Sequence, residues 1–395
     1  MINKIKSVHP FPARMAPSIL WKTIPSVKRS LTILDPMSGS GTTLAVAKIR
    51  GHHSIGYDTD PLAVLISNVW GSNINEKQIL VKVTQVLDEA KLLYKRIKSK
   101  DAYPINADNE TRAFARFWFD LKNRKQLKAL SISINNIDNS KIKSVLWCAL
   151  SRLIITKKAG VSLGMDISHS RPHKVYEKAP FSPFDKFLSS VKYVTKNAPF
   201  KNNKDNLARL KVKLGDARKL PIKDSCIDFV ITSPPYLNAI DYMRGHKLSL
   251  IWLGYNISKL RSIRSRNIGS ERNRLKNVVY HCASRIGVDK LSDRMKAVVF
   301  QYIYDMNMVL KESYRVLKRN GKAVFVVGNS TVKGAFVRNS EVINLLGRQN
   351  GFTTLSIRKR NLPPDKRYLP PPSSRTSGKD LAKRMRQEVV ITFAK

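Results

Sequence analysis

The sequence predicts an α/β fold with a mostly parallel sheet and a helical insertion. Residues 228–232 read Asp-Phe-Val-Ile-Thr, and such an unbroken apolar and β-branched run is typical of a strand buried on both faces. Residues 31–49 give a strand, a glycine-rich turn and an apolar helical run in that order. Three acidic residues stand where predicted strands end, at Asp35, Asp58 and Asp216. Open α/β sheets bind their ligands at that edge.

Length and charge narrow the classes of function. The 395 residues are 42% hydrophobic, which is enough for one large domain or two domains with a core. Lys and Arg number 72 and Asp and Glu 28, so the net charge is 72 − 28 = +44. So large an excess repels itself, and a polyanionic partner offsets that repulsion. Because the basic residues are spread along most of the chain, we predict a nucleic acid in a long groove.

Several other classes are not favoured. No apolar run approaches 18 residues, so we expect no membrane association. The start, Met1–Lys6, is positively charged, but no apolar core follows it, and we expect no signal peptide. Cys148, Cys226 and Cys282 are odd in number and widely spaced, which suits neither disulfides nor a zinc site. We therefore predict a cytoplasmic protein without a metal.

The elements begin with a proline-rich segment, residues 9–17, which we expect to be extended as a lid or as a simple capping arm. A short helix follows from near Ser18. The strand at 31–35 leads into Asp-Pro-Met-Ser-Gly-Ser-Gly, and a helix then begins at Thr42 and runs through Ile49. This order predicts a ligand cradle with free backbone N–H groups. No Lys follows the second glycine, so the loop is not of the nucleotide-phosphate type.

The second strand, His53–Asp58, ends in a carboxylate, and Pro61 suits the first position of a helix over 62–70. A carboxylate at the end of the second strand is the usual acceptor for ribose hydroxyls. A third acid, Asp216, follows the strand before the 228–232 strand. Each of the three acids has an alternative role as a helix N-cap.

An insertion from Ser72 to Asn206 is dominated by helical patterns, including 77–98 and 141–156. We expect its aromatic residues 114 and 117–119 to be core. The basic loop 168–174 is interpreted as a nucleic-acid contact, with a solvated linker as the alternative.

The chain then continues with a helix over 241–254 and a basic stretch over 259–276 that suits contact with a nucleic-acid backbone. A long amphipathic helix, 293–318, is expected to end at a left-handed Asn320–Gly321 cap. The remaining predicted elements are strands at 322–328, 352–358 and 387–393 and a helix at 340–350. The basic loop 358–386 between the last two strands is interpreted as a finger over bound duplex.

After the 228–232 strand, the two consecutive prolines cannot donate to a sheet ladder. They hold Ser233 and Tyr236 on a stiff turn at the carboxyl end of that strand. An ordinary strand-ending loop is the alternative.

Together these motifs resemble one family. Asp35-Pro36-Met37-Ser38-Gly39-Ser40-Gly41-Thr42-Thr43, with Thr232-Ser233-Pro234-Pro235-Tyr236, resembles the amino-methylating DNA methyltransferases, which use S-adenosyl-L-methionine. His9-Pro10-Phe11-Pro12 is similar to the methionine-pocket segment of that family. Gly56-Tyr57-Asp58 and Gly215-Asp216-Ala217 resemble its ribose-contacting and adenine-contacting motifs.

The resemblance implies a Rossmann-like class I methyltransferase sheet with an antiparallel last strand. It implies a catalytic domain made of 1–72 and 207–395. The region 73–206, the candidate target-recognition insertion, lies outside the resemblance, and 257–292 is a second, basic insertion. Which insertion reads DNA stays open.

The resemblance also implies roles for residues. The Ser233 hydroxyl and the Pro234 carbonyl would accept the two N–H groups of an exocyclic amine, and Tyr236 would stack on a base extruded from the duplex. Asp35 would favour the cationic cofactor, Asp58 would hold its ribose and Asp216 its adenine amine. No metal is needed.

Serine before Pro-Pro-Tyr is typical of the enzymes that methylate cytosine at N4, and Asp or Asn of those that methylate adenine at N6. We therefore predict a site-specific cytosine-N4 DNA methyltransferase acting on double-stranded DNA, with a cognate restriction endonuclease as a possible partner and a location on the nucleoid. The alternatives are an adenine-N6 enzyme, an RNA base-amine methyltransferase and a non-catalytic nucleic-acid-binding protein.

Overall fold

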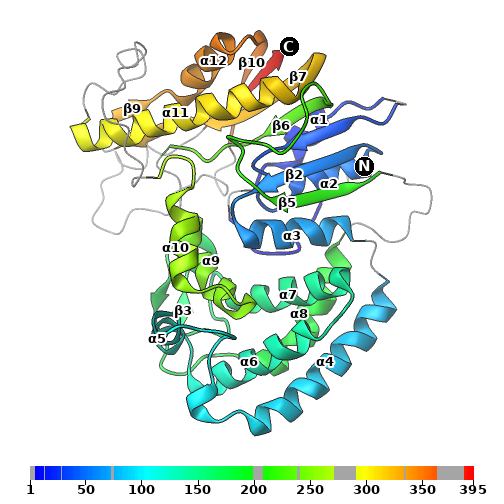
Figure 1. The fold of residues 1–395 in the computed structure, drawn as a ribbon, viewed down its shortest axis with the longest axis vertical. Coiled ribbons are helices and arrows are strands. Elements are labelled where there is room, and N and C mark those ends of the chain that lie inside the picture. The colour runs from blue at the N-terminus through cyan, green and yellow to red at the C-terminus, as the bar shows by residue number, and fades with distance from the viewer. Residues whose placement is uncertain are drawn as a thin grey trace. The chain divides into compact units, whose positions relative to one another are not determined.

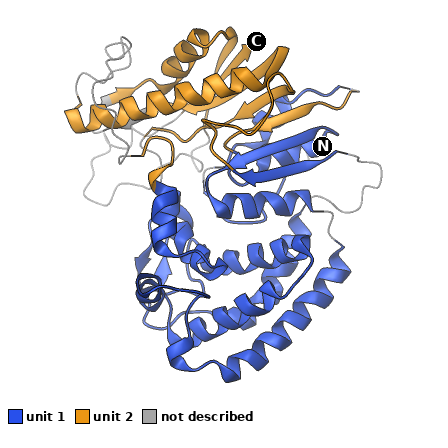
Figure 2. Cartoon of the chain, in the orientation of Figure 1, with its two compact units in different colours: residues 1–28, 38–214, 240–264 blue, residues 29–37, 215–239, 265–395 orange. Residues whose placement is uncertain are grey.

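The computed structural model describes residues 5–12, 14–27, 29–72, 75–198, 208–237, 241–270, 291–332, 335–362 and 387–395. The chain forms two compact units, which Figure 2 distinguishes by colour. Unit 1 consists of residues 1–28, 38–214 and 240–264. Unit 2 consists of residues 29–37, 215–239 and 265–395. Both units are therefore assembled from segments that are far apart in the sequence.

Unit 1 contains most of the described helices (Figure 1). They are α1 (Pro17–Thr23), α2 (Thr42–Ile49), α3 (Pro61–Gly71), α4 (Glu76–Arg96), α5 (Asn109–Trp118), α6 (Leu121–Asn135), α7 (Ser140–Ile154), α8 (Pro183–Asn197), α9 (Tyr242–Leu250) and, except for its last residue, α10 (Ile257–Ser265). Three short 3₁₀ turns are η1 (Ser99–Asp101), η2 (Ile167–His169) and η3 (Ile251–Leu253). Its strands are β2 (His53–Asp58), which pairs in parallel with β5 (Leu210–Leu214), and the hairpin of β3 (Gly164–Met165) and β4 (His173–Lys174).

Short polar side chains start the helices of the insertion. Asn75, Asp108, Asp120 and Asn139 precede α4, α5, α6 and α7, and each side chain accepts a hydrogen bond from a backbone N–H of the first turn. Such a cap satisfies an N–H group that has no partner within the helix, and it is worth about 1 kcal/mol. The starts of these helices are thus encoded locally.

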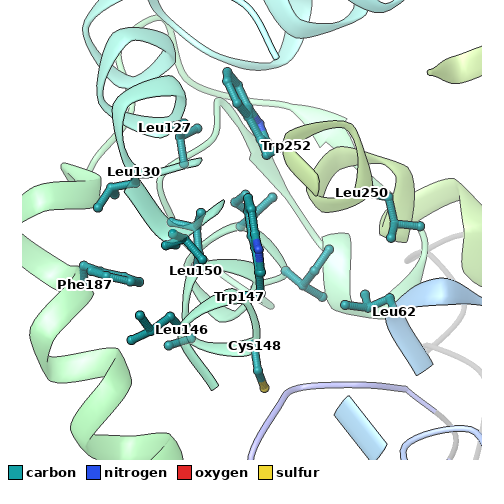
Figure 3. Close-up of a cluster of buried hydrophobic side chains, with 14 of the residues drawn as sticks. Leu62, Leu127, Leu130, Leu146, Trp147, Cys148, Leu150, Phe187, Leu250 and Trp252 are labelled. Atoms are coloured by element: carbon teal, nitrogen blue, oxygen red, sulfur yellow. The ribbon is translucent and has the colours of Figure 1, made fainter. Parts of the chain in front are cut away.

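The core of unit 1 lies among these helices (Figure 3). Trp147 and Leu150 of α7 are buried, as are Phe187 of α8 and Trp252 of η3. The Trp252 ring packs edge-to-face on Phe119, with centroids 5.4 Å apart. Large rings of this kind contribute most of the apolar area that a core removes from water. The helix predicted over 141–156 is confirmed by α7, most of whose second half is buried.

Unit 2 holds five strands in the order β10-β11-β7-β6-β1. Their bounds are β1 (Thr32–Asp35), β6 (Ile227–Thr232), β7 (Leu317–Gly328), β10 (Thr353–Asn361) and β11 (Gln387–Ala394). Strand β6 is parallel to both β1 and β7, and β11 is antiparallel to both β7 and β10. The unit also contains α11 (Asp293–Val316), α12 (Asn339–Gln349) and the short pair β8 (Ser330–Val332) and β9 (Ala335–Val337). The predicted fold class, a mixed α/β fold with a mostly parallel sheet and an antiparallel last strand, is confirmed.

The register of β1 and β6 determines the geometry of the site in unit 2. Ile33 lies beside Phe229 and Leu34 beside Val230. Because the two strands are parallel, their carboxyl ends reach the same edge of the sheet. Asp35 and Thr232, the last residues of β1 and β6, are therefore neighbours there.

One predicted boundary is wrong. Asn320–Gly321 does not cap the long helix, because α11 ends at Val316 and Leu317 is already extended. Asn320 is left-handed, with φ +63°, but it lies inside β7 and pairs with the C-terminal residue, since its N–H donates to the Lys395 carbonyl. The register with β6 shifts here, from Ile227↔Leu317 to Phe229↔Lys322. The same dipeptide that often ends a helix thus forms a bulge in a strand.

The other predicted strands and helices in the described part of the chain are confirmed within a few residues, and Gly351, with φ +98°, follows the end of α12. The expectation that Phe117 is core is wrong, because its side chain is 53% exposed, although Trp118 and Phe119 are buried. The basic stretch beyond residue 270 and the 363–386 part of the charged loop lie outside the described residues. In the described ranges, no helix combines the length and the apolar character needed to cross a membrane.

Candidate active site

The serine–proline turn begins where β6 ends. The Ser233 hydroxyl donates a hydrogen bond to the carbonyl oxygen of Val326 in β7, at 3.0 Å. Because a hydroxyl has one proton and two lone pairs, this bond uses the proton and leaves the oxygen as an acceptor. Pro234 is buried and Ser233 and Pro235 are half-buried. The turn therefore presents a fixed acceptor at the carboxyl end of a buried strand.

A buried carboxylate lies beside this turn. Asp35 is only 2% exposed, and its Oδ1 accepts hydrogen bonds from the Thr232 hydroxyl at 2.8 Å and from the Met37 N–H at 3.2 Å. The bond from Met37, two residues further on, closes the turn through Pro36. Asp35 is not a helix cap, since α2 begins only after Gly41. Its carboxylate is thus built into the junction of β1 and β6.

Tyr236 is oriented by residues that the sequence analysis did not identify. Its hydroxyl donates to Glu388 Oε1 at 3.1 Å, and the other oxygen of Glu388 accepts from Arg360 Nη1 at 2.8 Å. Glu388 belongs to β11 and Arg360 to β10, where the two residues are paired in register. No local motif marks Glu388, because more than 150 residues separate it from Tyr236 and only the strand order brings the two together.

Asp216 has a charged partner of its own. Both of its carboxylate oxygens accept hydrogen bonds from Arg218, whose guanidinium also reaches Asp305 of α11 at 2.7 Å. The neighbouring Ala217 is buried. The N-cap alternative does not apply here, because the Asp216 side chain accepts the Arg218 N–H outside any helix. A role for Asp216 toward an adenine amine stays a prediction, and any such contact must share the carboxylate with Arg218.

In unit 1 three backbone N–H groups of the glycine-rich loop already have hydrogen-bond partners. The N–H of Ser38 donates to Tyr57 O, that of Gly39 to Asp58 Oδ2, and that of Gly41 to Ser38 O. The expectation of free N–H groups is therefore wrong for these three residues, because the end of β2 supplies acceptors for two of them and Ser38 for the third. Ser38 Oγ is buried and has no hydrogen-bond partner in the described part of the chain.

The conformation of the loop depends on glycine at position 41 and on two side chains of helix α3. At Gly41, with φ +77°, an added Cβ would lie 2.6 Å from Ser67 Oγ. The Ser67 hydroxyl donates to the Gly39 carbonyl at 3.0 Å, and the Trp70 indole N–H donates to the Ser40 carbonyl at 2.7 Å. Two side chains of α3 thus hold the loop from below. Sequence reasoning had no signal for either, since both read as ordinary helix residues.

Asp58 joins the second strand to this loop. Its Oδ2 accepts the Gly39 N–H at 2.8 Å, and its Oδ1 accepts the Asp60 N–H at 2.9 Å. The cap of α3 is Asp60 rather than Asp58, because the Asp60 side chain accepts the Leu62 N–H. Asp58 therefore stands at the end of β2 with one oxygen bonded to each flanking turn, and its contact with a ribose stays a prediction.

The N-terminal segment, itself part of unit 1, packs close to the glycine loop and on α7. An added Cβ at Gly39 would lie 3.6 Å from the ring of Phe11, so that this ring lies close to the glycine loop. His9 is fully buried, and its Nε2 lies 2.9 Å from the Ser151 hydroxyl of α7. The segment thus contacts both the glycine loop and the helical insertion, as either the predicted lid or the predicted capping arm would. Contacts of residues 9–12 with a cofactor stay a prediction.

A buried histidine that the sequence analysis missed supports the same segment. His246 of α9 has no exposed surface, and its Nδ1–H donates to Asp60 Oδ2 at 2.5 Å. The Phe11 ring lies 4.9 Å from the imidazole ring. Asp60 is at once the cap of α3 and the acceptor for His246, so one carboxylate connects the helix beneath the loop with α9. A lone histidine in an apolar helix carries no signal for this role.

The burial of His9 predicts a dependence of stability on pH. Burial lowers the pKa of His9 well below 6.5, and the charges of His246 and Arg152 lower it further. Between the two pKa values the unfolded chain binds a proton that the folded chain does not. The contribution of neutral His9 is therefore complete above pH 6.5 and is lost as the pH falls toward the folded pKa.

We expect the free energy of unfolding to fall by up to about 1.4 kcal/mol per pH unit between pH 6.5 and 5 because of this residue alone. Urea unfolding of wild type and His9→Gln at pH 7.5, 6.5 and 5.5 measures the difference in slope. His173→Gln, at an exposed position, serves as the control. Equal pH slopes for wild type and His9→Gln would contradict the prediction.

Comparison with known proteins supports a methyltransferase. The chain is 24% identical over 389 residues to the Type II methyltransferase M.BsoBI of Geobacillus stearothermophilus, covering 82% of this chain and 74% of that protein. It is 24% identical over 398 residues to the Type II methyltransferase M.MvaI of Kocuria varians, covering 90% and 83%. A solved S-adenosylmethionine-dependent methyltransferase from Methanosarcina mazei matches at a TM-score of 0.34 and 10% identity, covering 97% and 99%. No protein-family model matches the chain.

Proposed function

We propose that this chain is a site-specific DNA methyltransferase that transfers a methyl group from S-adenosyl-L-methionine to N4 of a cytosine in duplex DNA. The hydrogen bond from Ser233 Oγ to the Val326 carbonyl is the observation that supports an amine as the acceptor of the methyl group. It commits the hydroxyl proton and leaves an acceptor for an N–H group. The relatives, both called Type II methyltransferases, support the transferase class. The net charge of +44 supports a nucleic acid as the acceptor.

Several residues fit the proposed cofactor. Ser38 Oγ is a buried polar atom that lacks a partner in the described chain, and Asp58 supplies a carboxylate for ribose hydroxyls. Glycine at position 41 lets the loop pack directly on Ser67 of α3, since a Cβ would lie 2.6 Å from Ser67 Oγ. In the proposal, residues 9–12 enclose the methionine end, Pro36–Thr43 and Tyr57 hold the adenosine end, and Asp216 with Ala217 contacts the adenine. When bound, the cofactor supplies an electrophilic methyl group on a sulfonium centre.

The protein groups of unit 2 act on the acceptor base. The exocyclic amine of cytosine is a weak nucleophile because its lone pair is delocalised into the ring. Ser233 Oγ and the Pro234 carbonyl accept its two N–H bonds in the proposal and thereby turn the lone pair out of conjugation. Asp35 is buried beside the turn and favours positive charge there. Tyr236, held by Glu388, stacks on the base after it has left the duplex.

Product analysis tests this proposal. The purified chain is incubated with plasmid DNA and cofactor carrying an isotope-labelled methyl group, and the DNA is digested to nucleosides for mass spectrometry. We expect labelled N4-methylcytosine, and sequencing of the product is expected to place it in one sequence context. If the labelled product is N6-methyladenine instead, the target base is adenine and not cytosine. Label in an equal amount of structured RNA but not in DNA would overturn DNA as the substrate. A cognate restriction endonuclease is part of the proposal and is tested by whether methylated plasmid resists it.

A further inference from the structure

A cavity of about 310 Å³ lies in the helical part of unit 1, between the end of α7 and the first half of α8. It takes no part in the proposed methyl transfer. Two aromatic residues, Phe181 and Tyr193, and two cationic residues, Arg152 and Lys186, line it, together with apolar side chains such as Leu153. The volume falls in the lower part of the range of small-ligand sites.

The cavity is held open by fixed contacts. After α7 the chain turns back so closely that a Cβ on Gly160 would lie 2.8 Å from the Leu153 carbonyl, which accepts the Val161 N–H. The Asn123 side-chain amide donates to the carbonyls of both Val161 and Phe181, at 3.0 and 2.8 Å. This amide ties together the two loops that contribute walls. The cavity is thus bounded by segments that these hydrogen bonds join to one another.

The cations at the cavity are held on aromatic rings. The Arg152 guanidinium carbon lies 3.7 Å from the centroid of Tyr193, and Lys186 Nζ lies 4.9 Å from that of Phe181. A guanidinium that stacks on a ring by its face keeps its N–H donors at the edge. Arg152 Nε is buried and has no hydrogen-bond partner in the described chain. The lining residues, all within the described ranges, include no Asp or Glu.

Three carbonyl groups near the end of α7 already have hydrogen-bond partners. Helix C-termini normally present unpaired carbonyls and favour cations. Here the carbonyls of Ser151, Leu153 and Thr156 each accept a backbone N–H, from Ile155, Val161 and Ser168. Pairing of these carbonyls leaves the two side-chain cations as the charged groups that face the cavity. An anion is therefore the ligand that the electrostatics favour.

We propose that the cavity binds one nucleotide unit, with its phosphate at Arg152 and Lys186 and its base against the rings of Tyr193 and Phe181. Both rings are about 40% exposed, at 41% and 40%, and so have free surface for stacking. Aromatic rings beside cations are the usual means by which proteins hold bases and phosphates without reading sequence. The unit is either a free nucleotide or part of a DNA strand. The second source rests on the proposed function, because DNA is the proposed substrate.

The first measurement uses thymidine 5′-monophosphate as the probe and isothermal titration of the full chain. We expect saturable binding by wild type, and affinity at least about tenfold lower in Arg152→Met and Lys186→Met, since each loses a charge-assisted hydrogen bond. Lys192→Met is the matched control, because Lys192 is exposed on the same helix and does not line the cavity. Should Arg152→Met unfold, the exposed Lys186 still supplies the test. Circular dichroism monitors folding of each variant.

Two further arms complete the test. Inorganic phosphate and thymidine are titrated separately, and each is expected to bind more weakly than the nucleotide that combines them. Duplex DNA binding is then measured against salt for Lys186→Met and Lys192→Met. A slope reduced by about one in Lys186→Met alone assigns the nucleotide unit to DNA. An unchanged slope with lost thymidylate binding assigns it to a free nucleotide.

Absence of thymidylate binding in wild type, together with equal DNA binding by the two lysine variants, would overturn the inference. If inorganic phosphate binds as tightly as thymidylate, the base takes no part in binding, and the inference is reduced to a phosphate site. None of these measurements depends on methyl transfer. Loss of the proposed activity with intact thymidylate binding therefore refutes the proposed function alone.

Discussion

Ser233→Ala is expected to lower kcat about 100-fold to 1,000-fold while the affinity for S-adenosyl-L-methionine stays within twofold of wild type. The reason is that the hydroxyl, with its proton bound to the Val326 carbonyl, offers an acceptor to the amine only as that amine is reoriented for attack. Removing one preorganised hydrogen-bonding group from a transition state typically has an effect of this size. Cofactor contacts are proposed for other residues, so binding and turnover should separate.

Three measurements check this prediction. Single-turnover transfer of a labelled methyl group gives the rate, calorimetry gives the cofactor affinity, and urea unfolding shows whether the unpaired Val326 carbonyl weakens the sheet. Ser144→Ala is the matched control, because its hydroxyl bonds within α7 to the Ser140 carbonyl. Parallel loss of turnover and cofactor affinity in Ser233→Ala would mean that the turn only supports the fold. Turnover that is unchanged would remove Ser233 from the reaction.

The sequence predicted the parts of the site that are local in the chain. A run of buried residues followed by two prolines gives the β6 strand and its turn, because burial pattern and proline chemistry act over a few residues. The glycine loop and the acid-ended strands are found in the same way. The sequence does not mark Glu388 or His246, because their contacts join residues that are 152 and 186 positions apart in the chain. It does not mark Trp70 either, because this residue lies on a regular helix.

The wrong boundary at Asn320–Gly321 has a similar cause. Asn-Gly favours left-handed backbone, and Asn320 does adopt it, so the local preference was identified correctly. The preference does not say whether a helix ends or a strand bulges there. That choice is made by the pairing of Asn320 and Gly321 with Lys395, the last residue of the chain. A tertiary contact thus decided between two structures that share one local conformation.

Asp58→Ala is expected to weaken binding of S-adenosylhomocysteine about tenfold to 100-fold. In the proposal the Asp58 carboxylate accepts the ribose hydroxyls, and hydrogen bonds to a charged group contribute about 1.5–3 kcal/mol. The same carboxylate holds Gly39 N–H and Asp60 N–H, so weaker binding alone would not separate a direct contact from a distorted loop. To separate the two explanations, the ribose of the ligand has to be changed as well as the protein.

The 2′-deoxyribose analogue of S-adenosylhomocysteine makes that separation. Wild type is expected to bind it at least about tenfold more weakly than the ribose form, while Asp58→Ala is expected to bind the two forms equally, because the acceptor that distinguishes them is gone. Asp88→Asn, at an exposed position on α4, should discriminate as wild type does. Calorimetry with the four combinations of protein and ligand gives the coupling directly. If Asp58→Ala still prefers the ribose form by the wild-type factor, the carboxylate acts by shaping the glycine loop, and the ribose must be held by another residue.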